Sequence, residues 1–293
     1  MIEGTFLYTT LRRLCDSGEI DRGASTLVVC GGQMDADCLR AVGFTEVTIS
    51  NLDESRSGEV YAPYRWSHQD AESLSFEDES FDLVMVHAGL HHCRSPHRGL
   101  LELYRVARRG VLVVEARDSL TLRIAARLRL APEYELEAVV DEGFQTGGVR
   151  NSAVPNYVYR WTEREVRKTL ASFEPCCPVD VEFFYGYRLP LERLEINKSA
   201  WLRLSVATFG MAAGVFFAVL PRQGNCFAFF VRKPQIQEKL WPWLIQTGEG
   251  FGVNRAWSDA RYRSRRPTSA TTGHDVPGHV KQEGSAGSNP RNE

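Results

Sequence analysis

The feature that most constrains the fold is a strand–turn–helix–strand pattern in residues 26–53. It opens with an apolar run, residues 27–30, that suits a strand buried on both faces, and Gly31 and Gly32 follow directly. A helical pattern and a second strand-like segment then lead to Asp53. This order is typical of the opening half of a doubly wound α/β fold, in which a carboxylate about 20 residues past the glycines binds a ribose hydroxyl pair. A βαβ unit without a ligand is the alternative.

Strand and helix continue to alternate after this unit. Residues 81–86 and 111–114 are continuous apolar runs that predict buried strands. Residues 96–107 between them have a helical apolar pattern, with Ser95 as its N-cap. Such alternation requires a mostly parallel sheet.

The second half of the chain is less regular. Residues 132–161 are rich in loop signals but also in aromatic residues, so we expect an ordered insertion. Two strand-like segments follow at residues 179–187 and 225–232. From residue 254 onward small and polar residues dominate, which predicts one domain over residues 1–253 and a disordered tail over 254–293.

Residues 204–220 form an uncharged apolar stretch between these two strands. Its length is at the lower limit for crossing a membrane. A strand-like segment follows after a short turn, which favours a helix that is buried or faces a partner. Membrane contact is the less favoured interpretation.

Composition narrows the class of protein. A net charge of −2 argues against nucleic acid as a bulk electrostatic partner. The seven cysteines are scattered and form no CxxC pair, so neither a zinc ribbon nor a disulfide framework is indicated. Because the first twenty residues lack the layout of a signal peptide, we expect a cytoplasmic, reduced protein.

Three motifs resemble those of the class I S-adenosylmethionine-dependent methyltransferases, most closely the small-molecule branch. They are DAESLSFEDESFDLV at residues 70–84, GLHH at 89–92, and the pair LELYRV and GVLVVE within 101–115. The resemblance spans residues 24–118. It implies a Rossmann-like sheet of seven strands, mostly parallel, with the two late strands as an antiparallel hairpin at its edge. It also implies S-adenosylmethionine as the cofactor.

The resemblance assigns the cofactor contacts to one end of the sheet. It implies that Asp53 binds the ribose, Asp70 the adenine amino group, and Ala71 the adenine ring. Gly31 and Gly32 would approach the methionine moiety, and His87 would face the crevice at the end of a buried strand. The alternatives are that Asp53 is a helix N-cap and that Asp70 bonds its own backbone in a turn.

Two departures from the family pattern concern this end. The glycine turn has two glycines where the family has three, with Met34 or Asp35 at the third position. We expect a side chain there to crowd the amino-acid end of the cofactor. The acid that the family has near the end of its first strand is also absent.

His91 and His92 are the candidate catalytic residues. Transfer to a hydroxyl requires a group that removes its proton, and an imidazole in the loop after a buried parallel strand suits that role. The alternative is that one of them packs and bonds a backbone carbonyl. Adjacent histidines do not easily share one ion, and no carboxylate lies at ligand spacing in the sequence, so we expect no metal.

The insertion carries the candidate substrate residues, namely Arg150, Asn151, Tyr157 and Tyr159. Aromatic rings with an Arg/Asn pair can bind a sugar or an anionic group. The alternative is a surface loop whose aromatic residues only hold it in place by packing.

We therefore predict methyl transfer to a small molecule or glycan precursor, with oxygen as the acceptor, by a protein that can form homo-oligomers. Two rivals remain. One is an inactive module that binds a partner protein through the 204–220 helix. The other is a nicotinamide-dependent dehydrogenase, which the missing three-glycine fingerprint disfavours.

Overall fold

A computed structural model describes residues 2–54, 59–188, 200–234, 240–248 and 250–262, with the backbone alone over 200–209. The chain divides into two compact units. The first contains residues 1–173 and 179–233, and the second contains residues 174–178 and 234–293. The candidate site lies in the first unit.

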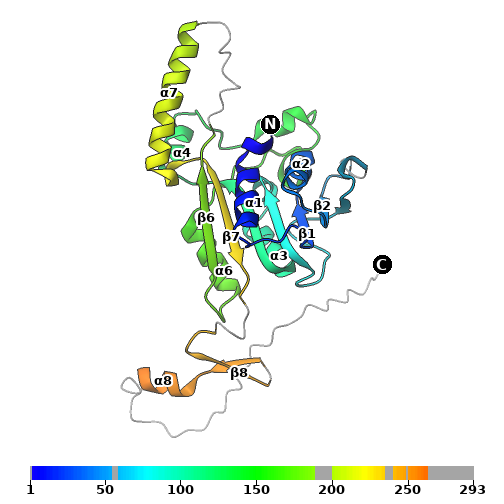
Figure 1. The fold of residues 1–293 in the computed structure, drawn as a ribbon, viewed down its shortest axis with the longest axis vertical. Helices are drawn as coiled ribbons and strands as arrows, with labels where there is room; N and C mark the ends of the chain where they lie inside the picture. The colour runs from blue at the N-terminus through cyan, green and yellow to red at the C-terminus, as the bar shows by residue number, and fades with distance from the viewer. Residues whose placement is uncertain (1, 55–58, 189–199, 235–239, 249, 263–293) are drawn as a thin grey trace. The chain divides into compact units, whose positions relative to one another are not determined.

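The first unit is built on a seven-stranded sheet with the order β3-β2-β1-β4-β5-β7-β6 (Figure 1). All neighbouring strands are parallel except β7, which is antiparallel to both β5 and β6. This confirms the predicted fold class and its edge hairpin. The strands are β1 (Thr26–Val29), β2 (Val47–Asn51), β3 (Arg65–His68), β4 (Phe81–His87), β5 (Ala107–Ala116), β6 (Asp180–Gly186) and β7 (Cys226–Arg232).

Alternating side chains of the strands supply two hydrophobic cores, one on each face of the sheet. In β1, for example, Val28 belongs to one core while Leu27 and Val29 belong to the other. Helices α1 (Phe6–Asp16) and α2 (Gln33–Val42) cover the first core. Helices α3 (Pro96–Val106) and α6 (Glu163–Phe173) cover the second.

The strand order positions the ligand site. Strand β2 lies on one side of β1 and β4 on the other, so the connections leave β1 in opposite directions along the sheet. Such a switch point opens a crevice outside the carboxyl ends of the strands, where open α/β sheets bind their ligands.

The helix after β4 begins as predicted, because the Ser95 hydroxyl accepts a hydrogen bond from the Arg98 backbone N–H.

The insertion between β5 and α6 is ordered. It contains α4 (Leu120–Arg127), α5 (Leu136–Asp141) and a short 3₁₀ turn, η5 (Val149–Asn151). An isolated bridge joins Tyr134 to Tyr157 across it.

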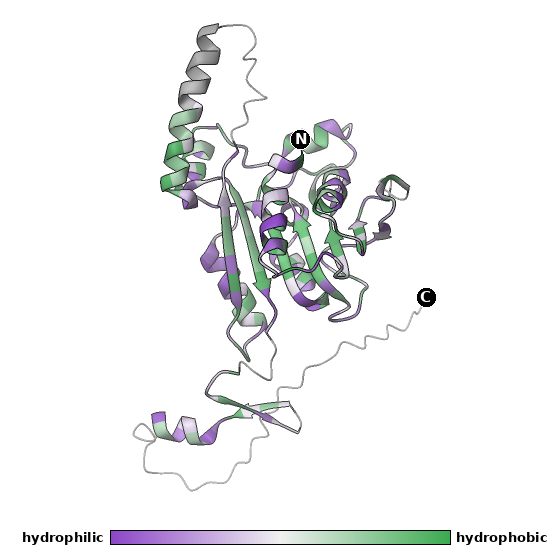
Figure 2. Ribbon diagram, viewed as in Figure 1, coloured by the Kyte–Doolittle hydropathy of each residue, from purple (hydrophilic) through white to green (hydrophobic). Residues whose placement is uncertain are grey.

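The apolar stretch at residues 204–220 lies mostly within α7 (Ala200–Val219), and Figure 2 shows the described end of this helix as hydrophobic. Most of the large apolar side chains at this end are exposed. Met211 and Val219 are 68% and 72% exposed, while Ala213 is buried and Phe217 stacks on Tyr187. Residues 210–219 of the helix thus pack on the unit at a few points, and most of their large apolar side chains are not buried. None of the described helices is long and apolar enough to cross a membrane.

The second unit contains an antiparallel hairpin of β8 (Leu244–Thr247) and β9 (Gly250–Val253), followed by α8 (Arg255–Tyr262). Helix α8 occupies the start of the stretch predicted to be disordered. Aromatic contacts account for this order, because Trp257 packs on Trp243 with ring centroids 5.6 Å apart. Residues 263–293 of the predicted tail lie outside the described residues.

Candidate active site

A cavity of about 350 Å³ opens at the carboxyl ends of the central strands. It is therefore located where the switch point places ligands. The loops after β1, β2, β3 and β4 form one side of its lining, and the insertion forms the other. The lining residues are Cys30, Asn51, Leu52, Asp53, Asp70, Ala71, Glu72, Ala88, Gly89, His92, Cys93, Ala138, Asp141, Glu142, Gly147, Gly148, Arg150 and Asn151.

Asp53, Asp70 and Ala71, three of the predicted cofactor residues, line this cavity. The Asp53 backbone N–H donates to Asn51 Oδ1 at 3.0 Å, which shapes the turn after β2. One oxygen of Asp70 accepts from the Glu72 backbone N–H at 2.9 Å, as in the turn alternative. Its other oxygen pairs with the Arg150 guanidinium at 2.6 Å. Asp70 thus combines a turn role with a position in the cavity wall.

The two glycines after β1 differ in what they do. A Cβ on Gly31 would lie 2.8 Å from an Ile49 methyl and 2.9 Å from a Val28 methyl, so this position needs glycine for packing. A Cβ on Gly32 would meet only Asp35, at 3.9 Å. Neither glycine lines the cavity, but Cys30 does, with a left-handed φ of 55°.

The effect of Met34 and Asp35 on the cofactor stays a prediction, but the structure shows where both side chains lie. The Asp35 carboxylate turns back to accept from the Gly32 backbone N–H at 2.8 Å, which caps α2. Its other oxygen pairs with His87 Nδ1 at 2.8 Å. Met34 is exposed, and neither side chain lines the cavity. His87, predicted as a cofactor residue, bridges the glycine turn and the end of β4, and it is not among the residues that line the cavity.

The histidine pair lies on a 3₁₀ turn, η4 (Leu90–His92), beside the cavity. The turn packs tightly on β1, because a Cβ on Gly89 would be 2.5 Å from the Cys30 Cβ. Glu115, at the end of β5, accepts from the Leu90 backbone N–H and pairs with His91 Nδ1 at 2.8 Å.

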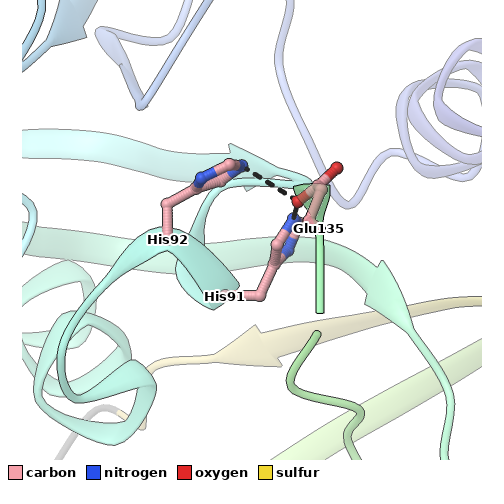
Figure 3. Close-up of side chains that lie close together, drawn as sticks. All are labelled: His91, His92 and Glu135. Atoms are coloured by element: carbon pink, nitrogen blue, oxygen red, sulfur yellow. Dashed lines mark ion pairs between the residues drawn. The ribbon is translucent and has the colours of Figure 1, made fainter. Parts of the chain in front are cut away.

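Glu135 joins the two imidazoles from the other side (Figure 3). Its Oε2 lies 3.2 Å from His91 Nε2 and 3.6 Å from His92 Nε2. His91 is therefore held at both ring nitrogens, whereas His92 lines the cavity.

The charges of this cluster are strongly coupled. Burial lowers the pKa of His91, but the carboxylates of Glu115 and Glu135 outweigh it and raise that pKa to about 10. Burial and the neighbouring His91 lower the pKa of His92. The hydrogen bond from His91 lowers the pKa of Glu135 to about 2.

The four predicted substrate residues separate into two pairs. Arg150 and Asn151 line the cavity from η5, both with left-handed φ angles, of 51° and 56°. Tyr157 contacts the ring of Tyr134, and Tyr159 donates to a carboxylate of α6. Neither tyrosine is part of the cavity lining.

Comparison with known proteins agrees with this architecture. Residues 28–114 match the family model described as "Methyltransferase domain". The matched residues lie within the stretch whose motifs resemble those of the class I methyltransferases. The cofactor of this class is S-adenosylmethionine.

The chain is 29% identical over 118 residues to the ubiquinone/menaquinone biosynthesis C-methyltransferase UbiE of Idiomarina loihiensis. That match covers 36% of this chain and 47% of the relative, so the chain spans about half the length of the curated relative it matches. Among solved structures it is similar to magnesium protoporphyrin IX methyltransferase from Synechocystis with bound SAH, with a TM-score of 0.47, 14% identity, and 78% and 82% of the two chains covered. It is also similar to a putative methyltransferase from Bacillus halodurans, with a TM-score of 0.46 and 16% identity. That match covers 78% of this chain and 100% of the other.

Sequence reasoning missed several residues of the candidate site. Asn51 and Glu115 end parallel strands, so the rule that ligands gather at the carboxyl edge could have found both. Glu135 and Asp141 lie in the insertion, where no periodicity or motif marks them. They reach the site only through the tertiary path of that insertion.

Proposed function

We propose that the chain transfers a methyl group from S-adenosylmethionine to a small molecule, such as a glycan precursor, and that an oxygen atom is the acceptor. One observation carries the proposal. A single cavity has the carboxylates of Asp53 and Asp70 on its sheet side and His92 on the turn after β4. It thus offers partners for both a nucleoside and an acceptor.

The lining residues fit the cofactor. Asp53 and Asp70 are carboxylates in the cavity lining, and carboxylate oxygens accept strongly from ribose hydroxyls and from an adenine amino group. Ala71 beside Asp70 leaves room for a flat ring. The volume of about 350 Å³ is within the range of small-molecule sites. When bound, S-adenosylmethionine supplies a methyl group on a sulfonium, which is a good leaving group.

The chain's own contribution is to position the acceptor. His92 is the histidine that lines the cavity, so the acceptor oxygen belongs beside it. His91 is held by two carboxylates and orients Glu135. A carbon acceptor is the second candidate, because the relative with 29% identity is named a C-methyltransferase.

The test begins with calorimetric titration of the purified protein with S-adenosylmethionine, S-adenosylhomocysteine and NAD. We expect the first two to bind and NAD not to bind. Incubation of small-molecule extracts with S-adenosylmethionine labelled in the methyl group should then yield a labelled product, and mass spectrometry should place the label on oxygen. Binding of NAD alone would establish the dehydrogenase. Cofactor binding without a labelled product in any extract would support the inactive module.

A further inference from the structure

We propose that His91, His92 and Glu135 bind a divalent first-row metal ion, with an open coordination position toward the cavity. Figure 3 shows the two imidazoles of η4 turned toward one carboxylate from the start of α5. One ligand atom from each residue lies within 4.8 Å of the other two. The carboxylate that the sequence does not place at ligand spacing is thus supplied by the fold.

The distances suit a metal centre. Ligand atoms about 2.0–2.2 Å from a tetrahedral ion lie roughly 3.4 Å from one another. The two separations between imidazole Nε2 and Glu135 Oε2 are 3.2 Å and 3.6 Å, on either side of this value. Two imidazoles and a carboxylate are also a donor set that zinc and non-haem iron sites use.

Outer hydrogen bonds orient the ligands, as they do in metal sites. Glu115, whose side chain is fully buried, holds His91 Nδ1 at 2.8 Å and thereby directs Nε2 toward the shared point. Asn156, also fully buried, donates from Nδ2 to Glu135 Oε2 at 3.2 Å. A carboxylate–histidine pair of this kind fixes the ring and its tautomer before an ion arrives.

The charges of the cluster are compatible with a bound ion. Metal ligation requires neutral imidazoles, so an ion would replace the proton that Glu115 and Glu135 hold on His91. With both imidazoles neutral, His91, His92, Glu115 and Glu135 together carry a formal charge of −2, which a divalent cation cancels.

The site has three protein ligands, and His92 is part of the cavity wall. Catalytic metal sites keep an open position beside three protein ligands, and that position takes water or substrate. An acceptor oxygen bound there would be polarised by the ion. This use of the ion rests on the proposed function, but metal binding itself does not.

The full-length protein, stripped with a chelator and dialysed, would be titrated with Zn²⁺ by calorimetry and with Co²⁺ by visible absorption. We expect one ion per chain and the intense absorption of a low-symmetry, tetrahedral-like Co²⁺ centre. H92A and E135Q should each weaken binding by at least about tenfold, and E115Q by roughly 10–100-fold, the usual effect of an outer-shell change.

A matched control is H97A. His97 Nε2 pairs with Glu165 at 2.9 Å in another histidine–glutamate ion pair, but without a second imidazole. Its loss should leave the affinity for Zn²⁺ and the Co²⁺ spectrum unchanged. Equal affinities in wild-type protein and in E135Q, with both variants folded by circular dichroism, would overturn the metal site.

Titration of the same preparations with S-adenosylmethionine separates this inference from the proposed function. Cofactor binding without a specific Zn²⁺ site refutes only the metal site. A specific Zn²⁺ site in a protein that binds no S-adenosylmethionine supports the metal site and refutes the methyltransferase activity.

Discussion

The ion pair between Arg150 and Asp70 joins a residue of the insertion to a predicted adenine ligand, so its removal tests both assignments. The two side chains are 52% and 22% exposed, and the N–O distance is 2.6 Å. Exposed pairs contribute about 0.2–1 kcal/mol, because solvent screens the attraction. R150A should therefore lower the free energy of unfolding by less than about 1 kcal/mol.

The effect on the cofactor has the opposite sign. Without Arg150, the Asp70 oxygen that pairs with the guanidinium loses a competing donor, so S-adenosylmethionine should bind as well as before or more tightly. The gain cannot exceed the free energy of the lost pair, and 1 kcal/mol corresponds to about fivefold in the dissociation constant. D70N should weaken binding by about 1.5–3 kcal/mol, the scale of hydrogen bonds to charged groups.

Calorimetric titration of R150A, D70N and the double variant measures these changes. R123A is a suitable control, because Arg123 pairs with Asp118 at 3.8 Å on the surface of the insertion, outside the cavity. Weakening of S-adenosylmethionine by more than tenfold in R150A would refute the reasoning, since Arg150 would then contact the cofactor itself.

Four other substitutions test the predicted ribose ligand, the glycine turn and the Asp82 carboxylate. D53A should weaken S-adenosylmethionine binding by about 1.5–3 kcal/mol in a folded protein, and an unchanged calorimetric affinity would remove Asp53 from the site. G31A should lower the free energy of unfolding by about 1–3 kcal/mol, because the added methyl group overpacks the core. G32A adds a methyl group that meets little, so its free energy of unfolding in urea should stay within about 0.5 kcal/mol of wild type. Burial raises the pKa of Asp82, but hydrogen bonds from Ser25 and Arg108 outweigh it and lower that pKa. The stability that the Asp82 carboxylate contributes is therefore present above the ordinary aspartate pKa, and it is lost as the pH falls through the folded-state pKa. D82N should therefore have a melting temperature that falls less than that of wild type between neutral and acidic pH.

The order of the sheet could be predicted because it depends on short-range signals. Buried parallel strands such as Phe81–His87 appear as continuous apolar runs, and Ser95 marks the helix that follows. The edge position of the late hairpin came from the family resemblance and not from periodicity.

The details of the glycine turn could not be predicted in the same way. Residue spacing places a side chain at Asp35 but does not say where it points. In the structure its carboxylate finds the Gly32 N–H and His87, so the loss of the third glycine is accommodated by a helix cap. Helix α8 was missed for a related reason, since its packing depends on Trp243, which lies directly before β8.

The two sides of the cavity have different origins, and this bears on the acceptor. The loops that follow the strands supply the predicted cofactor residues Asp53 and Asp70, whereas residues 132–161 supply Glu135 to the histidines and Arg150 to Asp70. Acidic side chains outnumber the single arginine of the lining, and that arginine is paired. An anionic acceptor would meet this negative wall, while the hydroxyls of a neutral sugar could donate to it. Among acceptors that suit an Arg/Asn pair, the electrostatics therefore favour a neutral, hydroxyl-rich molecule.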